Sequence, residues 1–176
     1  MILRSVFLQM VDEKLVDKDK SFLKILIRKP GRNESGVLNI TILTPPKPKW
    51  KDKETGKMKK QNFSCKHNCY FCPNEIEDGV MKMPRSYLSR EPACLRASRN
   101  DFEPIQQIYD RLYTLEMMGH PLDKLEIIIL GGTWDHYPIE YQKEYIRDIY
   151  YSANVFSMPE KRERYSLEKE IYLNET

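Results

Sequence analysis

Three of the four cysteines of this 176-residue chain lie within eight positions, at Cys65, Cys69 and Cys72. A C-x3-C-x2-C run of this length fits only on a tight loop. Three thiolates there can hold three irons of a [4Fe–4S] cluster, because each iron takes one cysteine. The fourth iron then lacks a protein ligand and stays open to an outside molecule, as the open position of a catalytic zinc site does. The spacing therefore favours an iron–sulfur cluster that can bind a small molecule.

Other uses of these thiols stay open. A tetrahedral zinc site made of the three cysteines and His67 is common chemistry, although such sites usually place their ligands in two pairs across a longer loop. A disulfide is less favoured, because the first residues do not resemble a secretory signal and three clustered thiols cannot all pair. Cys94 stands apart, and we interpret it as a buried structural thiol, since free cysteine packs as a small hydrophobe.

Two apolar segments can position the cysteine loop. The run from Val37 to Leu43 predicts a strand that leads toward the cysteines, and the run from Leu125 to Leu130 predicts a second strand, buried on both faces. The second strand runs into Gly131, Gly132 and Thr133, where missing Cβ atoms would let a ligand contact the backbone. Ligands of α/β folds bind at the carboxyl ends of strands, so we expect the loop and the glycine pair to share a site.

Helices are predicted around these strands. Apolar residues recur at helical spacing within 6–29, 104–118 and 138–151, and the tail after Ser157 has helical propensity. The order strand, loop, helix, strand, helix defines an α/β fold with two β/α units and a right-handed crossover. Because a closed barrel needs roughly six or eight such units, we expect an incomplete, partial (β/α) barrel.

Positive charge is concentrated in the first part of the chain. Residues 1–63 carry 15 Lys and Arg against 7 Asp and Glu, whereas the remainder carries 14 against 19. Seven lysines lie within 45–60, which we predict to be a flexible loop or a short hairpin. Such a cluster favours a polyanion such as RNA, although a merely solvated loop stays open as an alternative. The candidate RNA-binding residues are Lys47, Lys49, Trp50, Lys59 and Lys60, with Trp50 as a base-stacking platform or as a cover for the core edge.

The composition indicates a globular protein without a membrane span. Hydrophobic residues make up 40% of the chain and charged residues 31%, which is unlike a disordered chain. No apolar run approaches the ~20 residues of a transmembrane helix. Together with unpaired cysteines, these features favour a cytoplasmic protein.

The segment from Ser86 to Ala93, SYLSREPA, resembles the S-Y-T-G-x-E-P-A segment of the Elongator catalytic subunit family. Members of that family are radical S-adenosylmethionine (SAM) enzymes that modify the wobble uridine of tRNA. Further motifs agree in order and spacing, among them Asp101-Phe102, Gly119-His120 and Gly131-Gly132-Thr133, and the similarity covers about residues 35–157. The C-x3-C-x2-C spacing likewise resembles the radical SAM superfamily.

This resemblance implies cofactors and residues that bind them. The ligands of the [4Fe–4S] cluster would be Cys65, Cys69 and Cys72. The residues that contact SAM would be Phe71, Gly131, Gly132 and Thr133. Lys124 matches a family lysine that contacts acetyl-coenzyme A, the acetyl donor. In the family, a carbon radical on the acetyl methyl group is thought to add to C5 of the uridine.

The chain departs from the family pattern in three places and in extent. The family often spaces its first two cysteines further apart than Cys65 and Cys69 are here. Leu88-Ser89 replaces a threonine–glycine pair, and Asn74-Glu75 follows Pro73 where the family has two glycines. The expected domains are a basic helical segment (1–34), a truncated radical SAM domain (35–157) and a charged helical tail (158–176). We expect a fragment or reduced form that lacks the acetyltransferase domain, and a second chain that completes the barrel is one way to make it active. The alternative is a non-catalytic module that binds tRNA or a cluster.

Overall fold

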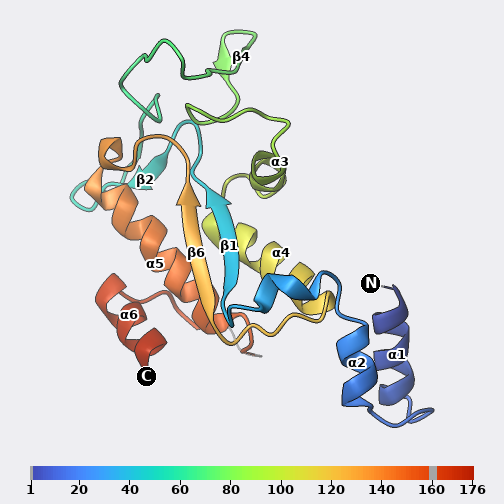
Figure 1. Ribbon diagram of the computed structural model, residues 1–176. Coiled ribbons are helices and arrows are strands. Elements are labelled where there is room, and N and C mark those ends of the chain that lie inside the picture. The colour runs from blue at the N-terminus through green and yellow to red at the C-terminus, as the bar shows by residue number, and fades with distance from the viewer. Residues whose placement is uncertain (1, 159–161) are drawn as a thin grey trace. The chain divides into compact units, whose positions relative to one another are not determined.

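The chain folds into helices and short strands (Figure 1). The computed structural model describes residues 2–158 and 162–176. The α-helices are α1 (Ile2–Asp12), α2 (Lys20–Ile25), α3 (Pro92–Arg99), α4 (Pro104–Met117), α5 (Ile139–Val155) and α6 (Leu167–Glu175). The strands are β1 (Leu38–Leu43), β2 (Lys49–Lys51), β3 (Met58–Lys60), β4 (Ile76–Glu77), β5 (Val80–Met81) and β6 (Leu125–Leu130), and two 3-10 helices are η1 (Pro30–Asn33) and η2 (Trp134–His136). No helix within the described ranges is long and apolar enough to cross a membrane. This mixed α/β content confirms the coarse fold class.

The chain divides into two compact units. The first consists of the segment up to Ile40 together with Asp110–Ile127, and the second consists of Thr41–Tyr109 together with Ile128–Thr176. The domain boundaries that the sequence predicts at residues 35 and 157 stay a prediction.

β1 and β6 form a two-stranded sheet although 81 residues separate them in the sequence. The Leu38 amide donates to the Lys124 carbonyl, and the Thr44 amide donates to the Leu130 carbonyl, both at 2.9 Å. Because the offset between partners is the same at both ends, the strands run parallel, and Figure 1 shows both arrows pointing the same way. Both predicted strands are therefore confirmed.

The two strands differ in burial. In β1, Ile40, Ile42 and Leu43 are at most 1% exposed, whereas Ile128 of β6 is 41% exposed and no residue of β6 is fully buried. The prediction that β6 is buried on both faces is wrong. An apolar run signals a strand that can be buried, but burial needs neighbours, and a two-stranded sheet supplies few.

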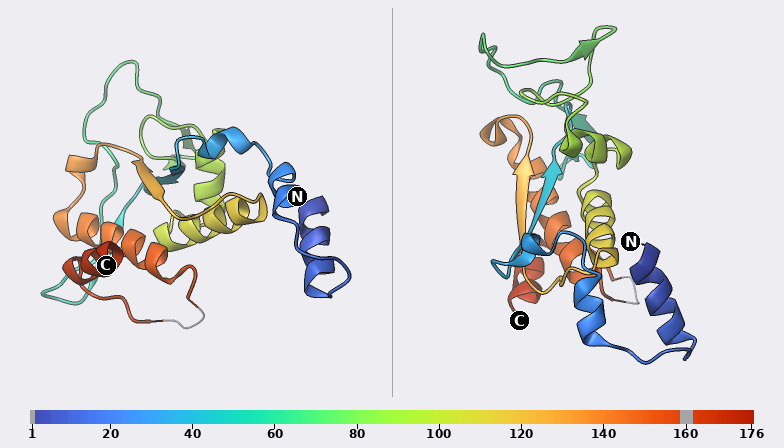
Figure 2. Two further views of the ribbon diagram at one scale, coloured as in Figure 1. Left: turned by 60° about the horizontal axis from the view of Figure 1, so that its bottom comes forward. Right: turned by 45° about the vertical axis from the view of Figure 1, so that its right-hand side comes forward.

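In the first unit, α1 and α2 form a pair of short helices that lie side by side in both figures (Figures 1 and 2). Asp19 caps α2, because its carboxylate accepts hydrogen bonds from the amides of Ser21 and Phe22 at 2.8 and 3.3 Å. The rings of Phe7 and Phe22 meet edge-on with centroids 4.9 Å apart. The predicted helices within 6–29 are confirmed.

The second unit has a small core around the end of β1 and α3. The buried members are Leu43, Met83, Cys94 and Ala97, and Tyr87, Phe102 and Leu130 pack against them. Cys94 is completely buried, as predicted for a structural thiol. Burial, followed by the nearby carboxylates of Glu91 and Glu75, raises the pKa of its thiol to about 11.

The amide side chain of Gln107 in α4 completes the hydrogen bonding of β1. Its Nε2 donates to the Leu43 carbonyl, and its Oε1 accepts from the Leu43 amide, both at 2.9 Å. Gln107 thereby takes the place of a further strand at the end of β1, where unpaired buried backbone groups would be costly.

The C-terminal helix α6 packs against α5, and the two lie side by side in both figures (Figures 1 and 2). Glu170 of α6 is fully buried, and its carboxylate accepts two hydrogen bonds from the Arg162 guanidinium at 2.9 and 2.6 Å. Asn154 of α5 and the Tyr165 amide donate to it as well, at 3.1 Å each. The predicted helical tail is confirmed for Leu167–Glu175, and residues 159–161 lie outside the described residues.

Candidate functional site

In space, the first residue of the cysteine loop (Cys65–Cys72) lies beside the carboxyl end of β6. Ser64, which precedes the loop, is fully buried, and its carbonyl accepts a hydrogen bond from the Thr133 amide at 3.1 Å. On the other side, the Ser64 hydroxyl accepts one from the Arg85 amide at 2.7 Å. The structure thus brings the start of the loop together with the residue after the glycine pair.

Both glycines at the end of β6 are required by the packing of the chain itself. A Cβ on Gly131, whose φ is +148°, would lie 1.8 Å from the Thr44 hydroxyl oxygen, and one on Gly132 would lie 2.0 Å from the Ser64 carbonyl oxygen. The Gly132 amide also donates to the Tyr137 hydroxyl at 3.0 Å. The pair therefore lets the loop start lie directly against the strand end, in addition to any ligand contact.

Cys65 has the most defined surroundings of the three loop cysteines. The Thr133 hydroxyl donates a hydrogen bond to its sulfur at 3.1 Å. Desolvation opposes ionisation of this thiol, but hydrogen bonds from Thr133 and the His67 backbone and the charge of Arg85 outweigh it. The pKa of Cys65 therefore lies below its usual value, which favours the thiolate that binds metals.

The other half of the loop lies in solvent. Cys69 is exposed and Cys72 is partly exposed, and the Cys72 amide donates to the Cys69 carbonyl at 3.2 Å. Phe71 between them is 89% exposed, and Tyr70 is fully exposed. Across residues 2–158 and 162–176, no three His, Cys, Asp or Glu side chains gather closely enough to hold a metal ion.

The donor set of the loop nevertheless fits an iron–sulfur cluster. All three cysteines are free thiols on one short loop, and one of them already favours the thiolate. Cys69 and Cys72 would have to move toward Cys65 to share a cluster, and their exposed positions leave room for this.

The basic segment (residues 47–60) forms an antiparallel hairpin of β2 and β3. A short hairpin is one of the two alternatives that the sequence predicts for it. Lys49 lies directly opposite Lys60, and Trp50 lies opposite Lys59. Lys59 forms an ion pair with Asp52, and this hydrogen bond, followed by those from Thr55, holds the pKa of the Asp52 carboxyl well below its usual range. Lys49 and Lys60 have no ion pair with any described residue.

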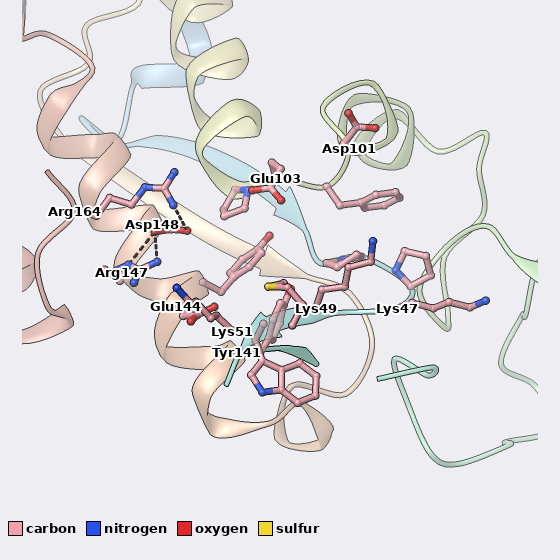
Figure 3. Close-up of a pocket in the computed structure, with 17 residues that line it drawn as sticks. Lys47, Lys49, Lys51, Asp101, Glu103, Tyr141, Glu144, Arg147, Asp148 and Arg164 are labelled. Carbon is pink, nitrogen blue, oxygen red and sulfur yellow. Dashed lines mark hydrogen bonds and ion pairs between the residues drawn. The ribbon is translucent and has the colours of Figure 1, made fainter. Parts of the chain in front are cut away.

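A cavity of about 650 Å³ lies beside this hairpin in the second unit (Figure 3). From the hairpin side it is lined by Lys47, Lys49, Trp50 and Lys51, and from α5 by Tyr141, Glu144, Tyr145, Arg147 and Asp148. Figure 3 shows Asp148 joined to Arg147 and Arg164, at 2.9 and 3.3 Å. Burial raises the pKa of Asp148, although both guanidinium groups oppose the rise. Trp50 is half-buried beside this cavity, so part of its side chain is covered by the protein and part stays accessible.

Lys124 immediately precedes β6, whereas Gly131, Gly132 and Thr133 follow it. The lysine is exposed, and its carbonyl pairs with the Leu38 amide. Lys124 and the glycine pair therefore lie at opposite ends of one strand.

Sequence reasoning missed two sets of residues near these sites. His136 accepts a hydrogen bond from Lys66 of the loop and another from Gln61, and no local pattern identifies a partner 70 or more residues away. Glu144, Arg147 and Asp148 line the cavity, and their spacing of three and four residues along α5 could have placed them on one helix face with Tyr141 and Tyr145.

No protein-family model matches the chain. The chain is 35% identical over 161 residues to a tRNA uridine(34) acetyltransferase of Methanocaldococcus infernus, which covers 91% of this chain and 26% of that protein. A protein of the same name from Methanocaldococcus jannaschii is 35% identical over 132 residues, 74% of this chain and 21% of the relative. Elongator complex protein 3 of Drosophila melanogaster is 30% identical over 134 residues, 76% of this chain and 22% of the relative.

The chain is thus a mixed α/β protein whose relatives are named for the acetylation of a tRNA uridine. It belongs to the Elongator catalytic subunit family. The chain spans about a quarter of the length of the curated relatives that it matches.

Proposed function

We propose that this chain is part of a radical SAM protein that modifies uridine 34 of tRNA, with a [4Fe–4S] cluster on Cys65, Cys69 and Cys72. The observation that carries the proposal is the hydrogen bond from Thr133 to Cys65, which links the loop to the end of β6. The membership of the chain in this family adds to it. When bound, the cluster would supply one-electron chemistry to a molecule on its open iron.

The proposed SAM contacts are Phe71, Gly131, Gly132 and Thr133. The exposed ring of Phe71 offers an apolar face on which an adenine can stack. At the strand end, the glycines present backbone without side chains, and the carboxyl end of a parallel strand is where α/β folds bind ligands. These features support the assignment that the family resemblance implies.

The finer fold assignment belongs to the same proposal. β1 and β6 would be the first two strands of a partial (β/α) barrel, each followed by a loop of the proposed site and then by a helix. The partly exposed β6 is consistent with a sheet that continues, either in a second chain or in a longer form of this one.

The basic hairpin is the proposed contact for tRNA, through Lys47, Lys49, Trp50, Lys59 and Lys60. Two like charges directly opposite each other destabilise a strand pair, as Lys49 and Lys60 must do. A phosphate between them would remove this repulsion, which supports an RNA backbone as the partner. The half-buried Trp50 leaves part of its ring free to stack on a base.

Lys124 is proposed to contact acetyl-coenzyme A on the family resemblance alone. Its exposed side chain leaves the ammonium free for an anionic ligand.

A second candidate function is a non-catalytic module, or a subunit of a split enzyme, that binds tRNA or a cluster. The observation that favours it is the basic hairpin, whose strand pairing sets Lys49 opposite Lys60 without any contribution from the cysteine loop. Such a module would keep the hairpin and the loop but turn over no substrate by itself.

Anaerobic reconstitution of the full chain with iron and sulfide tests the proposal. The reduced protein should show the electron paramagnetic resonance signal of a [4Fe–4S] cluster, and the signal should shift when SAM is added. A cluster that is indifferent to SAM would favour the module. Bound zinc without iron would overturn the cluster assignment.

A further inference from the structure

We infer that Thr133 and His136 are positioning residues that hold Cys65 in place before a cluster binds, so that this cysteine is the fixed ligand around which the other two close. The inference rests on the proposed function of the loop as a cluster site. It concerns residues of the turn after β6, which neither the motif nor the names of the relatives assign to this role.

Backbone contacts fix the residue before Cys65. The Thr133 amide donates to the Ser64 carbonyl at 3.1 Å, and the missing side chain of Gly132 lets the two segments approach this closely. Gln61 adds a second link, because its Nε2 donates to the carbonyls of Phe63 and His136, at 2.8 and 3.1 Å. The backbone is therefore held against the turn after β6 as far as Ser64, the residue before Cys65.

Side-chain contacts fix Cys65 and the residue after it. The Thr133 hydroxyl donates to the Cys65 sulfur at 3.1 Å. His136 Nδ1 accepts a hydrogen bond from the Lys66 amide at 3.4 Å, and the His136 ring lies 5.0 Å from that of His67. Bonds from one short turn thus reach the positions before, at and after the first cysteine.

The other two cysteines have no comparable support. Within the described ranges, the hydrogen bonds of Cys69 and Cys72 are the backbone bond between them and a long contact of 3.8 Å from the Cys72 sulfur to the Pro73 carbonyl. Phe71 and Tyr70 lie in solvent rather than packing on the turn. This one-sided anchoring distinguishes a prepared first ligand from two ligands that are free to adjust.

The Thr133 hydroxyl has a further consequence once Cys65 ligates a cluster. A hydrogen bond to a ligand sulfur stabilises the more electron-rich, reduced state, so it raises the reduction potential. A role that is only structural would not predict this shift.

Amide hydrogen exchange of the full chain without iron tests the positioning role independently of the cluster. His136→Phe should lose the protection of the segment 64–67, whereas His136→Asn, which keeps an acceptor near Nδ1, should retain most of it. Exchange in the hairpin 49–60 serves as an internal control and should not change. Equal protection in wild type and His136→Phe would overturn the assignment of His136.

Potentiometric titration of the reconstituted protein tests Thr133. Thr133→Val should lower the midpoint potential of the cluster, and Thr133→Ser, which keeps the hydroxyl, should restore it. An unchanged midpoint in Thr133→Val would overturn the hydrogen bond to the ligand sulfur. Failure of the wild-type chain to take up iron would count against the proposed function, and the exchange result would then decide the positioning role.

Discussion

The basic hairpin and the cysteine loop follow one another along the chain but hold their shapes by different means. The hairpin is closed by its own ladder, and Asp52 secures its turn by accepting from the amide and the hydroxyl of Thr55, at 2.7 and 2.6 Å. The Asp52 backbone adds bonds to Lys57 and Gly56, both at 2.9 Å. The hairpin therefore needs no ligand to be complete.

The cysteine loop has almost no internal structure of this kind. It is tied to the end of β6 at Cys65, and beyond that point its aromatic side chains lie in solvent. The loop therefore presents two exposed aromatic rings and three free thiols. The contrast teaches that the hairpin is held by its own contacts, whereas the loop is held chiefly at its first cysteine, where we propose that a cluster binds.

Loss of one loop cysteine should have the largest effect on this comparison. We expect Cys69→Ser to abolish cluster binding, because three thiolates are the minimum that holds a cluster with one open iron. Iron and sulfide content after anaerobic reconstitution measures the result. Cys94→Ala is the matched control, since this buried thiol lies in the core and should leave the iron content unchanged. Full iron content in Cys69→Ser would refute the ligand assignment.

Glycine substitutions should separate the two regions next. Gly132→Ala would push a Cβ against the Ser64 carbonyl, an overpacking that costs about 1–3 kcal/mol or more in free energy of unfolding. Gly56→Ala in the hairpin turn has open space around it, and only its φ of +66° opposes the change, at about 1 kcal/mol. Denaturant titration compares the two variants. A larger loss in Gly56→Ala would show that the loop start is not the tighter contact.

The sequence predicts these elements well where the signal is local. β6 is confirmed at the predicted bounds Leu125–Leu130, and the helix that begins at Pro104 and the hairpin within 47–60 are confirmed as well. In each, hydrophobic periodicity, a proline or a turn glycine lies within the element itself. The prediction that β6 is buried on both faces is wrong, because the burial of a strand depends on neighbours outside it.

The site could be predicted only in outline. The cysteine spacing and the glycine pair indicate that two strand ends meet, since that follows from parallel topology. The bond from Thr133 to Cys65 and the partners of His136 join residues 68 and 70 positions apart, and side-chain geometry at that separation leaves no pattern in the sequence. The register of the hairpin also decides which lysine pairs with Asp52. It distinguishes Lys59 from other lysines that look alike in the sequence.

Lysine substitutions in the hairpin should have an intermediate effect. Replacing Lys49 and Lys60 together by alanine should weaken tRNA binding and reduce the slope of log K against log salt by about two, roughly one for each phosphate contact. Lys59→Ala should reduce the slope less, because this ammonium is paired with Asp52. Filter binding or fluorescence anisotropy across a salt series measures the slopes. An unaltered slope in the double variant would remove the hairpin from the tRNA-binding surface.

The smallest effect is expected at Asp52 and tests whether the hairpin is self-sufficient. The pKa of this carboxyl is depressed, chiefly by the hydrogen bond from Lys59, so its stabilisation is complete at neutral pH and is lost only as pH falls below the ordinary aspartate value of about 4. Asp52→Asn should remove the ion pair at every pH and modestly speed amide exchange in 49–60, while Thr55→Val, which removes the hydroxyl donor alone, should act more weakly. Exchange rates measured at pH 7 and at about pH 5 should agree in the wild type after correction for intrinsic rates. If the hairpin loosened already at pH 5, its shape would depend on a group other than Asp52, and the contrast with the cysteine loop would weaken accordingly.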